Sequence, residues 1–538
     1  MTTPEALFDE ETRLLLKTAL APGDAALAAF AAWRDRFDLD AIGQGARRLM
    51  PLAHANLRAA GCADPLMGRI RGIRRFDWAH NQMLLQGASH ALAALHAAGI
   101  DTIVLKGAAM IAGWYRDAGL RPLGDVDILV PTAQARAAVA CLAEAGWRPQ
   151  GTTPRVLCEV HLRHLNAWAF GRTVGHSVDL HWHMLSQAHQ TDADAAYWAR
   201  AAPARIAGQD TRVLCAEDQL FHACAHGMQA RSADRFSWPA DAAWILRASG
   251  KAFDWDRVVA LARQTRLTLQ LALCLRFLRD EIALDVPGSA IEELDCAPSS
   301  PIERAELRLR PMQPDQVGRA GTALLALQDF RRRTGDLVHR PAVAALVPWA
   351  AEAWGLDGTA TTLGYALAAA CGRPDWLRPL WLRRPRRRLL ARLDPATLTD
   401  APLAFANLTD DTLAHGWSEP EANGRWTDGP EAVAVFRLPD AGGAIALRAV
   451  VEPFVVARHS RLTVDVWAND VRAGRWRFGF GAANSTAQTL LVPAGAVGAD
   501  RLLTLTFVLR KPGRPAALGH STDRRQLGLF VRSLALSP

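Results

Sequence analysis

The sequence predicts an α+β protein in which a mixed sheet with helical regions on either side of it is followed by a separate C-terminal β-sandwich. Three observations support this fold class. Ala, Leu and Arg recur with helical spacing over most of residues 5–345. A short apolar run that holds two aspartates, DVDILV at 125–130, has the composition of a buried strand. From about residue 402, Val, Leu, Thr and Phe alternate between turns rich in Gly, Pro, Asn and Asp.

The length of the chain requires several domains. At 538 residues, half of them apolar, the chain exceeds what one hydrophobic core holds. Shifts in composition divide it into five expected regions: an N-terminal helical region 1–98, a sheet-containing core 99–205, a helical domain 206–345, a basic linker 346–400 and a β-sandwich 401–538.

Each element of the expected core follows from a local pattern. Apolar or alternating runs predict strands, and helical spacing that ends at a glycine predicts helices. The expected order is a strand at 100–105, a helix at 108–116, a strand at 125–130, a helix at 132–145 and an alternating strand at 176–183. Residues 216–340 are expected to be helical.

Two aspartates on one strand suggest a metal site. Asp125 and Asp127 are two residues apart, so their carboxylates project from the same face of a strand. Like charges this close are costly unless a cation lies between them. Mg²⁺ takes oxygen ligands, usually one or two carboxylates together with substrate phosphates. A Lys-Gly turn at 106–107, upstream of this pair, suits phosphate binding, so the pattern indicates phosphoryl or nucleotidyl transfer.

Residues 10–340 resemble a known family. A strand, a Lys-Gly turn, a helix, an Arg, the run GDVDILV and the later run VDLHW resemble the bacterial uncharacterised nucleotidyltransferase family, of the DNA polymerase beta-like nucleotidyltransferase superfamily. The resemblance implies a nucleotidyltransferase-like mixed sheet, Mg²⁺ in a two-metal site and an NTP as donor substrate. It also implies that Asp179 is the third acid beside Asp125 and Asp127, both as a metal ligand and as the group that activates the acceptor.

The resemblance also assigns the nucleotide-binding residues. Gly107 would supply the turn that faces phosphate, and Ala108 replaces the serine usual in the superfamily. Lys106, a lysine in a chain whose basic residues are nearly all arginine, would compensate for the missing hydroxyl. Either Lys106 or Arg121 would neutralise the charge that leaves with pyrophosphate.

Three histidines are candidate substrate-binding residues. His181 shares the strand face of Asp179, and it either contacts substrate or orients that acid. His222 and His226 are four residues apart and share a helix face. They either hold the acceptor or line a seam between helices.

The C-terminal region has a second possible binding site. Its strands resemble the β-module found on bacterial enzymes of surface-polysaccharide synthesis. Trp417, Arg425 and Trp426 would form a platform for glycan, because aromatic faces stack on sugar rings; the alternative is that both tryptophans anchor the core.

The charge pattern bears on partners and location. The net charge is +8, and residues Arg373–Arg392 hold eight arginines against one aspartate, which favours either a solvated connector or contact with an anionic membrane surface. No nucleic acid is expected as partner, because the basic tract is short and no familiar nucleic-acid-binding motif is present. An acidic N-terminus without an apolar core, scattered cysteines and the lack of a long apolar run predict a cytoplasmic protein, with peripheral attachment to the inner membrane as a variant.

The sequence therefore predicts a Mg²⁺-dependent nucleotidyltransferase that moves an NMP from an NTP to an unknown acceptor: a sugar, a lipid-linked glycan or a protein, in surface-glycan metabolism. Two alternatives remain open. One is a non-catalytic glycan- or protein-binding scaffold that keeps the fold, and the other is a kinase-type phosphotransferase.

Overall fold

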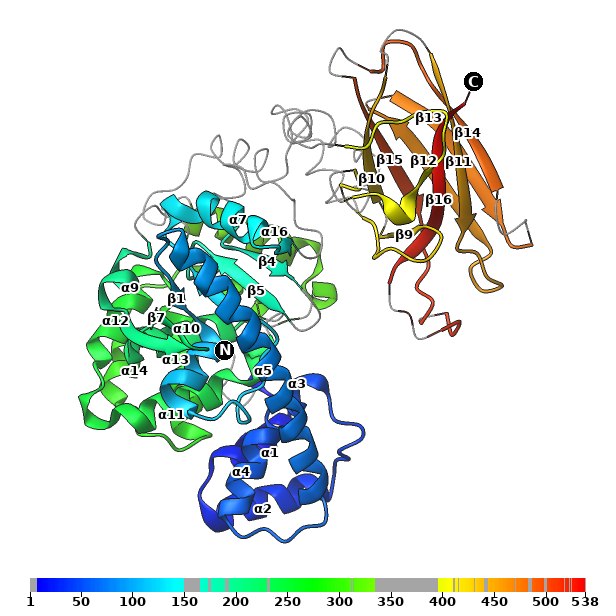
Figure 1. Ribbon diagram of the computed structural model, residues 1–538. Coiled ribbons are helices and arrows are strands. Elements are labelled where there is room, and N and C mark those ends of the chain that lie inside the picture. The colour runs from blue at the N-terminus through cyan, green and yellow to red at the C-terminus, as the bar shows by residue number, and fades with distance from the viewer. Residues whose placement is uncertain are drawn as a thin grey trace. The chain divides into compact units, whose positions relative to one another are not determined.

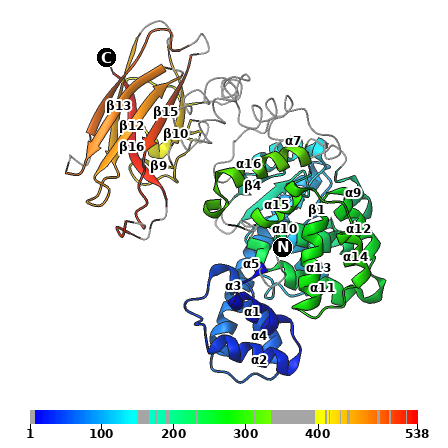
Figure 2. The same ribbon diagram turned by 180° about the vertical axis from the view of Figure 1, so that it is seen from behind.

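The computed structural model describes residues 7–149, 165–172, 176–188, 193–229, 233–310, 312, 314–333 and 395–537, apart from short gaps after residue 409. These residues form two compact units (Figures 1 and 2). Described residues up to 333 belong to the first unit, and those from 395 onward belong to the second.

The first unit contains most of the helices. Their bounds are α1 Glu10–Leu20, α2 Gly23–Arg34, α3 Gln44–Arg47, α4 Met50–Ala59, α5 Met67–Ala97, α6 Lys106–Met110, α7 Ala135–Glu144, α9 Ala195–Arg200, α10 Ala216–Gly227, α11 Trp238–Ser249, α12 Trp255–Gln264, α13 Thr268–Asp280, α14 Gly288–Asp295, α15 Pro301–Leu309 and α16 Pro314–Arg333. A π-helical turn, η2 Ile111–Tyr115, continues α6, and short 3₁₀ turns are η3 Thr132–Gln134, η4 Ala233–Phe236 and η5 Gly250–Ala252.

One mixed sheet of seven strands lies in this unit, in the order β3-β4-β5-β2-β1-β7-β6. Its strands are β1 Ile103–Val104, β2 Val126–Leu129, β3 Arg148–Pro149, β4 Ala167–Gly171, β5 Ser177–His181, β6 Ala202–Ile206 and β7 Gln209–Val213. Strand β2 runs parallel to β5 and antiparallel to β1, and β1 runs parallel to β7. The α+β class with a mixed sheet is therefore confirmed.

The two faces of the sheet pack against different helices. Val126 and Ile128 of β2 belong to an apolar core shared with α5 and α7, and α5 crosses the sheet in Figure 1. Leu129, on the opposite face of the same strand, packs into the larger core formed with the α1–α4 and α10–α14 helices. Asp127 lies between these residues in sequence, so it projects from the face of Leu129, toward the helical region.

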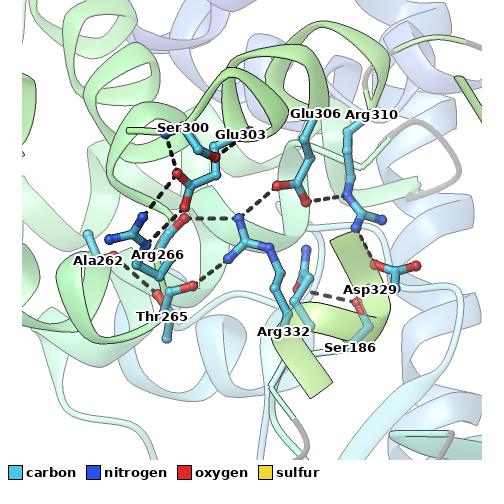
Figure 3. Close-up of polar contacts among 11 residues, drawn as sticks. Ser186, Ala262, Thr265, Arg266, Ser300, Glu303, Glu306, Arg310, Asp329 and Arg332 are labelled. Atoms are coloured by element: carbon cyan, nitrogen blue, oxygen red, sulfur yellow. Dashed lines mark hydrogen bonds and ion pairs between the residues drawn. The ribbon is translucent and has the colours of Figure 1, made fainter. Parts of the chain in front are cut away.

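A buried ionic network ties α16 to the helices before it (Figure 3). The Glu306 carboxylate accepts from Arg310 Nε at 3.0 Å and from Arg332 Nη2 at 2.7 Å, and Arg310 also pairs with Asp329. Arg266 Nε donates to Glu303 Oε1 at 2.9 Å, and Glu303 closes a capping box with Ser300 at the start of α15. Each of these carboxylates has an arginine partner.

The second unit is a β-sandwich. Its strands are β8 Leu403–Ala404, β9 Arg425–Asp428, β10 Glu431–Arg437, β11 Ile445–Pro453, β12 Arg461–Ala468, β13 Val471–Gly479, β14 Thr486–Val492, β15 Leu502–Arg510 and β16 Leu527–Ser537, and a 3₁₀ turn η7 spans Phe405–Asn407. One sheet has the order β10-β15-β12-β13, and the other has β14-β11-β16-β8 with β9 paired to β16. Alternate residues of both sheets fill one apolar core.

Several helices, strands and regions begin or end at other residues than expected. The strand expected at 125–130 begins at Val126, so Asp125 precedes it, and the helix expected at 108–116 begins two residues earlier, at Lys106. Strands β6 and β7 belong to the central sheet, because β7 pairs with β1. The sheet therefore extends to Val213, beyond the boundary expected at residue 205. The basic tract Arg373–Arg392 lies outside the described residues.

Candidate functional site

The parallel pairing of β2 with β5 brings two acidic residues together. Asp127 lies directly opposite Asp179 in the register, and His181 follows two residues later on the same face. One ligand atom from each of Asp127, Asp179 and His181 lies within 4.8 Å of the others. Residues 54 positions apart in sequence thus form one cluster, and its two carboxylates suit a hard divalent cation.

Asp127 is buried and held by two partners. Lys106 Nζ lies 2.5 Å from Asp127 Oδ1, and His181 Nε2 lies 2.9 Å from the same oxygen. Burial acts to raise the pKa of Asp127, but the Lys106 charge and the His181 hydrogen bond outweigh it and hold the pKa well below its usual value. Asp127 is therefore an ionised carboxylate.

His181 acts on Asp127 as a hydrogen-bond donor. An ionised carboxylate only accepts hydrogen bonds, so the proton in this contact lies on His181 Nε2. His181 Nδ1 lies 3.4 Å from Asn166 Nδ2 and 3.4 Å from the His183 carbonyl. While this arrangement holds, Nε2 has no lone pair to offer a metal ion, so His181 orients Asp127 rather than coordinating beside it.

Asp179 has the opposite electrostatic character. It is half-buried, and burial together with the nearby Asp127 charge raises its pKa. Lys106 and His181 lower the pKa of Asp179 only in part. Two carboxylates so close, with one of them poorly compensated, form a donor set that a divalent cation would relieve.

Lys106 adopts an unusual backbone conformation where it opens α6. Its φ of 49° lies in the left-handed region, which is costly for a residue with a side chain. The strained turn aims the side chain at Asp127, and only 13% of that side chain is exposed. Lys106 is therefore a built-in positive charge at the acidic cluster.

Close packing limits the size of the side chains at Gly107 and Ala108. A Cβ on Gly107 would lie 2.4 Å from Leu123 Cδ2, so any larger residue would displace Leu123. Ala108 is buried in the core shared with α5 and α7. Both positions let the short helix α6 lie close to its neighbours.

Arg121 is committed to a buried ion pair. Its Nε lies 3.0 Å from Asp241 Oδ1 and its Nη2 lies 3.0 Å from Asp241 Oδ2, and Tyr115 donates a hydrogen bond to Oδ1. Arg121 is 3% exposed. A role for Arg121 in binding phosphate would require this pair with α11 to open.

His222 of α10 lies close enough to the acidic cluster for the charges of the cluster to change the pKa of His222. Burial lowers the pKa of His222 well below its usual value, and the charges of His226, Lys106 and His181 add to this effect. Its ring meets that of His226 edge to face at 5.9 Å. His222 Nε2 is buried and makes no hydrogen bond within the described part of the chain. His222 is therefore a neutral imidazole beside the site.

Asp125 lies just before β2 and is half-buried. Among the described residues, the cluster of ligand atoms within 4.8 Å comprises Asp127, Asp179 and His181, and it does not include Asp125. Strand β2 begins at Val126, so Asp125 lies outside the strand in which alternate residues share a face.

Two residues that the sequence did not single out shape the site. Asn81 of α5 donates to the carbonyls of Ala118 and Arg121 and accepts from the Leu123 amide, which fixes the loop before β2. Asn166 lies beside His181. No local motif marks either residue, because their partners are 15 or more positions away.

The residues expected to bind glycan have different surroundings in the β-sandwich. Trp417 bridges to Thr427, so Trp426, next to Thr427, projects from the opposite face of the pairing. Trp417 Nε1 donates to the Val433 carbonyl, and its ring packs on Phe405 and Phe507. Arg425 is half-buried and donates to the Leu408 carbonyl. Trp417 is therefore an anchor of the core, and glycan binding by Trp417, Arg425 and Trp426 stays a prediction.

The sheet-containing region is similar to a known protein family. Residues 45–280 match the family model of an uncharacterised nucleotidyltransferase. The matched region is less than half of the 538-residue chain. It includes the whole seven-stranded sheet and Lys106, Asp127, Asp179 and His222, and the β-sandwich lies outside it. No curated protein matches the chain.

The helices carry no sign of a membrane span. Within the described ranges, none is both long and apolar enough to cross a bilayer.

Proposed function

We propose that the chain is a Mg²⁺-dependent nucleotidyltransferase that moves an NMP from an NTP to a hydroxyl or phosphate of an acceptor. The observation that carries this proposal is the register of β2 with β5, which puts Asp127 opposite Asp179 within a region matched to a nucleotidyltransferase family.

Asp127, Asp179 and Asp125 are the proposed ligands of Mg²⁺. Asp127 and Asp179 contribute from facing strands, and Asp125 contributes from the turn before β2. Bound there, Mg²⁺ supplies Lewis-acid stabilisation of charge on the phosphates. The protein's contribution is a pair of carboxylates that the sheet fixes, and His181 orients one of them, Asp127.

In the proposed reaction, an oxygen of the acceptor forms a bond to the α-phosphorus of the NTP. The bond from that phosphorus to the oxygen bridging to the β-phosphate breaks, and pyrophosphate leaves. For a hydroxyl acceptor, Asp179 accepts the proton. Lys106, which shares the cluster, balances the negative charge that develops on the leaving pyrophosphate. The acceptor is proposed to be a sugar, a lipid-linked glycan or a protein.

The test is the release of pyrophosphate from each NTP with Mg²⁺ and a cell extract as the source of acceptor. The wild type should release pyrophosphate, and Asp127→Asn and Asp179→Asn should not. Asp101→Asn is the matched control, because Asp101 is an exposed acid just before β1. Equal pyrophosphate release by all four proteins would refute the site, and ADP in place of pyrophosphate would make the protein a kinase.

One observation favours the alternative of a non-catalytic scaffold. Lys106 Nζ lies 2.5 Å from Asp127, so a lysine already compensates the acid that would hold the metal ion. Calorimetric titration with Mg²⁺ and ATP distinguishes the two functions. The enzyme should bind Mg²⁺ together with ATP, whereas a scaffold stabilised by the Lys106–Asp127 pair should bind neither.

A further inference from the structure

A cluster of arginines on the outer face of the β10-β15-β12-β13 sheet has no part in the function proposed above. In the register of β12 with β13, Asp465 lies opposite Arg475 and Thr463 lies opposite Arg477. Residues that lie opposite each other in an antiparallel pair share a face. The intervening residues of β12, including Val464 and Val466, are in the core, so this cluster faces away from it.

Three guanidinium groups meet at the single carboxylate of Asp465. Arg475 Nε lies 2.6 Å from Oδ1, Arg472 Nη2 lies 3.0 Å from Oδ1, and Arg510 Nη2 lies 3.0 Å from Oδ2. Asp465 is 6% exposed. These arginines lower the pKa of Asp465 although burial acts to raise it, so the carboxylate stays ionised and anchors all three side chains.

The anchored arginines keep donors for another molecule. The side chains of Arg472, Arg475 and Arg510 are 43%, 28% and 59% exposed. Each guanidinium has five N–H donors, and the contacts to Asp465 use only one or two of its nitrogens. Within the described part of the chain, these three arginines share Asp465 as their acidic partner.

The charge on this face is unbalanced. Arg477 and Arg461, both exposed, lie on the same face of β13 and β12. Across β12, β13 and β15, five arginines therefore share the face with one carboxylate. The far strand β10 adds Glu431 and Arg437, which offset each other.

Protection of a sheet edge does not explain this arrangement. Charged side chains on an edge strand discourage pairing with another chain, and β13 is an edge strand. Arg510, however, is on β15, which is an inner strand. Edge protection also gives no reason for arginines from two strands to meet at a buried acid on a third. Such an acid orders the guanidinium groups in advance and lowers the entropy that binding would cost.

We propose that this face binds an acidic polysaccharide. Guanidinium groups pair with carboxylate or sulfate groups through two hydrogen bonds, and several of them in fixed positions suit a chain of repeated anionic units. Trp467, half-buried on the same face between Asp465 and Arg472, offers an aromatic surface to a sugar ring, and the hydroxyls of Thr463 and Thr504 lie on this face as well. A single tryptophan is a poor match for single-stranded nucleic acid, which stacks successive bases on several aromatic rings.

The experiment measures binding of polygalacturonate to the full chain, over a range of salt concentrations. Arg477→Gln/Arg510→Gln is the test variant, because it leaves Arg472 and Arg475 to hold Asp465. Arg448→Gln/Arg514→Gln is the control, since it removes the same charge from exposed positions on β11 and in the loop after β15. We expect a loss of affinity of about tenfold or more in the test variant, with a weaker salt dependence, and less than about twofold in the control.

A third variant, Trp467→Leu, tests the aromatic contact separately from charge. It should weaken binding without changing the salt dependence, and circular dichroism and thermal unfolding report whether each variant remains folded. The absence of binding by wild type, equal losses in test and control variants, or tighter binding of single-stranded DNA or of anionic lipid vesicles than of polygalacturonate would each overturn the proposal. None of these outcomes depends on nucleotidyl transfer, so the two proposals succeed or fail independently.

Discussion

The first unit contains two clusters of buried and half-buried carboxylates that differ in how their charge is balanced. In the network around Glu306, the arginines 266, 310 and 332 match the acids 303, 306 and 329 (Figure 3). At the sheet, Lys106 and a histidine face Asp127 together with Asp179. The first cluster lowers the pKa of Glu306, whereas the second leaves Asp179 with a raised pKa.

The comparison separates a structural role from a functional one. A buried ionic network that only holds helices together gains by satisfying every charge, because an unpaired buried charge is costly. A site that receives a cation retains an uncompensated acid until the cation arrives. By this criterion Glu306 is structural, and the Asp127–Asp179 pair has the charge balance expected of the proposed cation site.

The largest expected effect is on catalysis. Asp127→Asn should lower the rate of pyrophosphate release by about a thousandfold or more, since loss of a metal ligand removes several kcal/mol of transition-state stabilisation. Steady-state kinetics with the most active NTP measures it. If the turnover of Asp127→Asn were within tenfold of wild type, the Asp127 cluster would be structural, like the Glu306 network, and the two clusters would not differ in role.

The second effect is on stability. Glu306→Gln should lower the free energy of unfolding of the first unit by about 3–5 kcal/mol, because it leaves the buried Arg332 and the half-buried Arg310 without their shared acid. Urea denaturation measures it. Asp329→Asn is the control: Asp329 is 24% exposed and, among the described residues, pairs with Arg310, so the loss should be about 1 kcal/mol or less. Equal losses in the two variants would contradict a buried network centred on Glu306.

The third effect is a pH dependence of stability. Burial acts to raise the pKa of Glu306, but Arg332 and Arg310 lower it below the unfolded-state value of 4.5. A group whose folded pKa is lowered contributes stability that is present above its unfolded pKa and is lost as the pH falls through its folded pKa. Wild type should therefore lose stability progressively below pH 4.5, and Glu306→Gln should lose less over the same range. Parallel stability curves would show that Glu306 is not the linked group.

The smallest expected effect is on Mg²⁺ binding, and it tests how far Lys106 balances the charge of the Asp127 cluster. Removing the ammonium in Lys106→Met should tighten Mg²⁺ binding in the absence of nucleotide by about tenfold, because a positive charge within a few ångströms of the cation costs a few kcal/mol before screening. It should also weaken NTP binding. Calorimetry measures both, with Lys251→Met, an exposed lysine, as control. Unchanged Mg²⁺ affinity would show that Lys106 does not compete for Asp127.

The sequence by itself determined the class of the fold and the central strands. Strands β2 and β5 were predicted because apolar periodicity is a local property. The sequence also marked Asp127, Asp179 and His181 as chemically important. The strand expected from Asp125 begins at Val126 instead, so Asp125 precedes it. The expected end of the core, at residue 205, lies before β7, because a strand this short is recognised by its pairing with β1 and not by its own sequence.

Only the tertiary structure decided which charges meet. The register of β2 with β5 puts Asp127 opposite Asp179, and the strained turn at Lys106 supplies a counter-charge. Arg121, expected near phosphate, pairs instead with Asp241, 120 positions away. Electrostatic energy depends on distance in space and on burial, and sequence spacing fixes neither beyond one helix or strand. The same reason explains Asp465, whose three arginine partners on two other strands could not be read from the linear sequence.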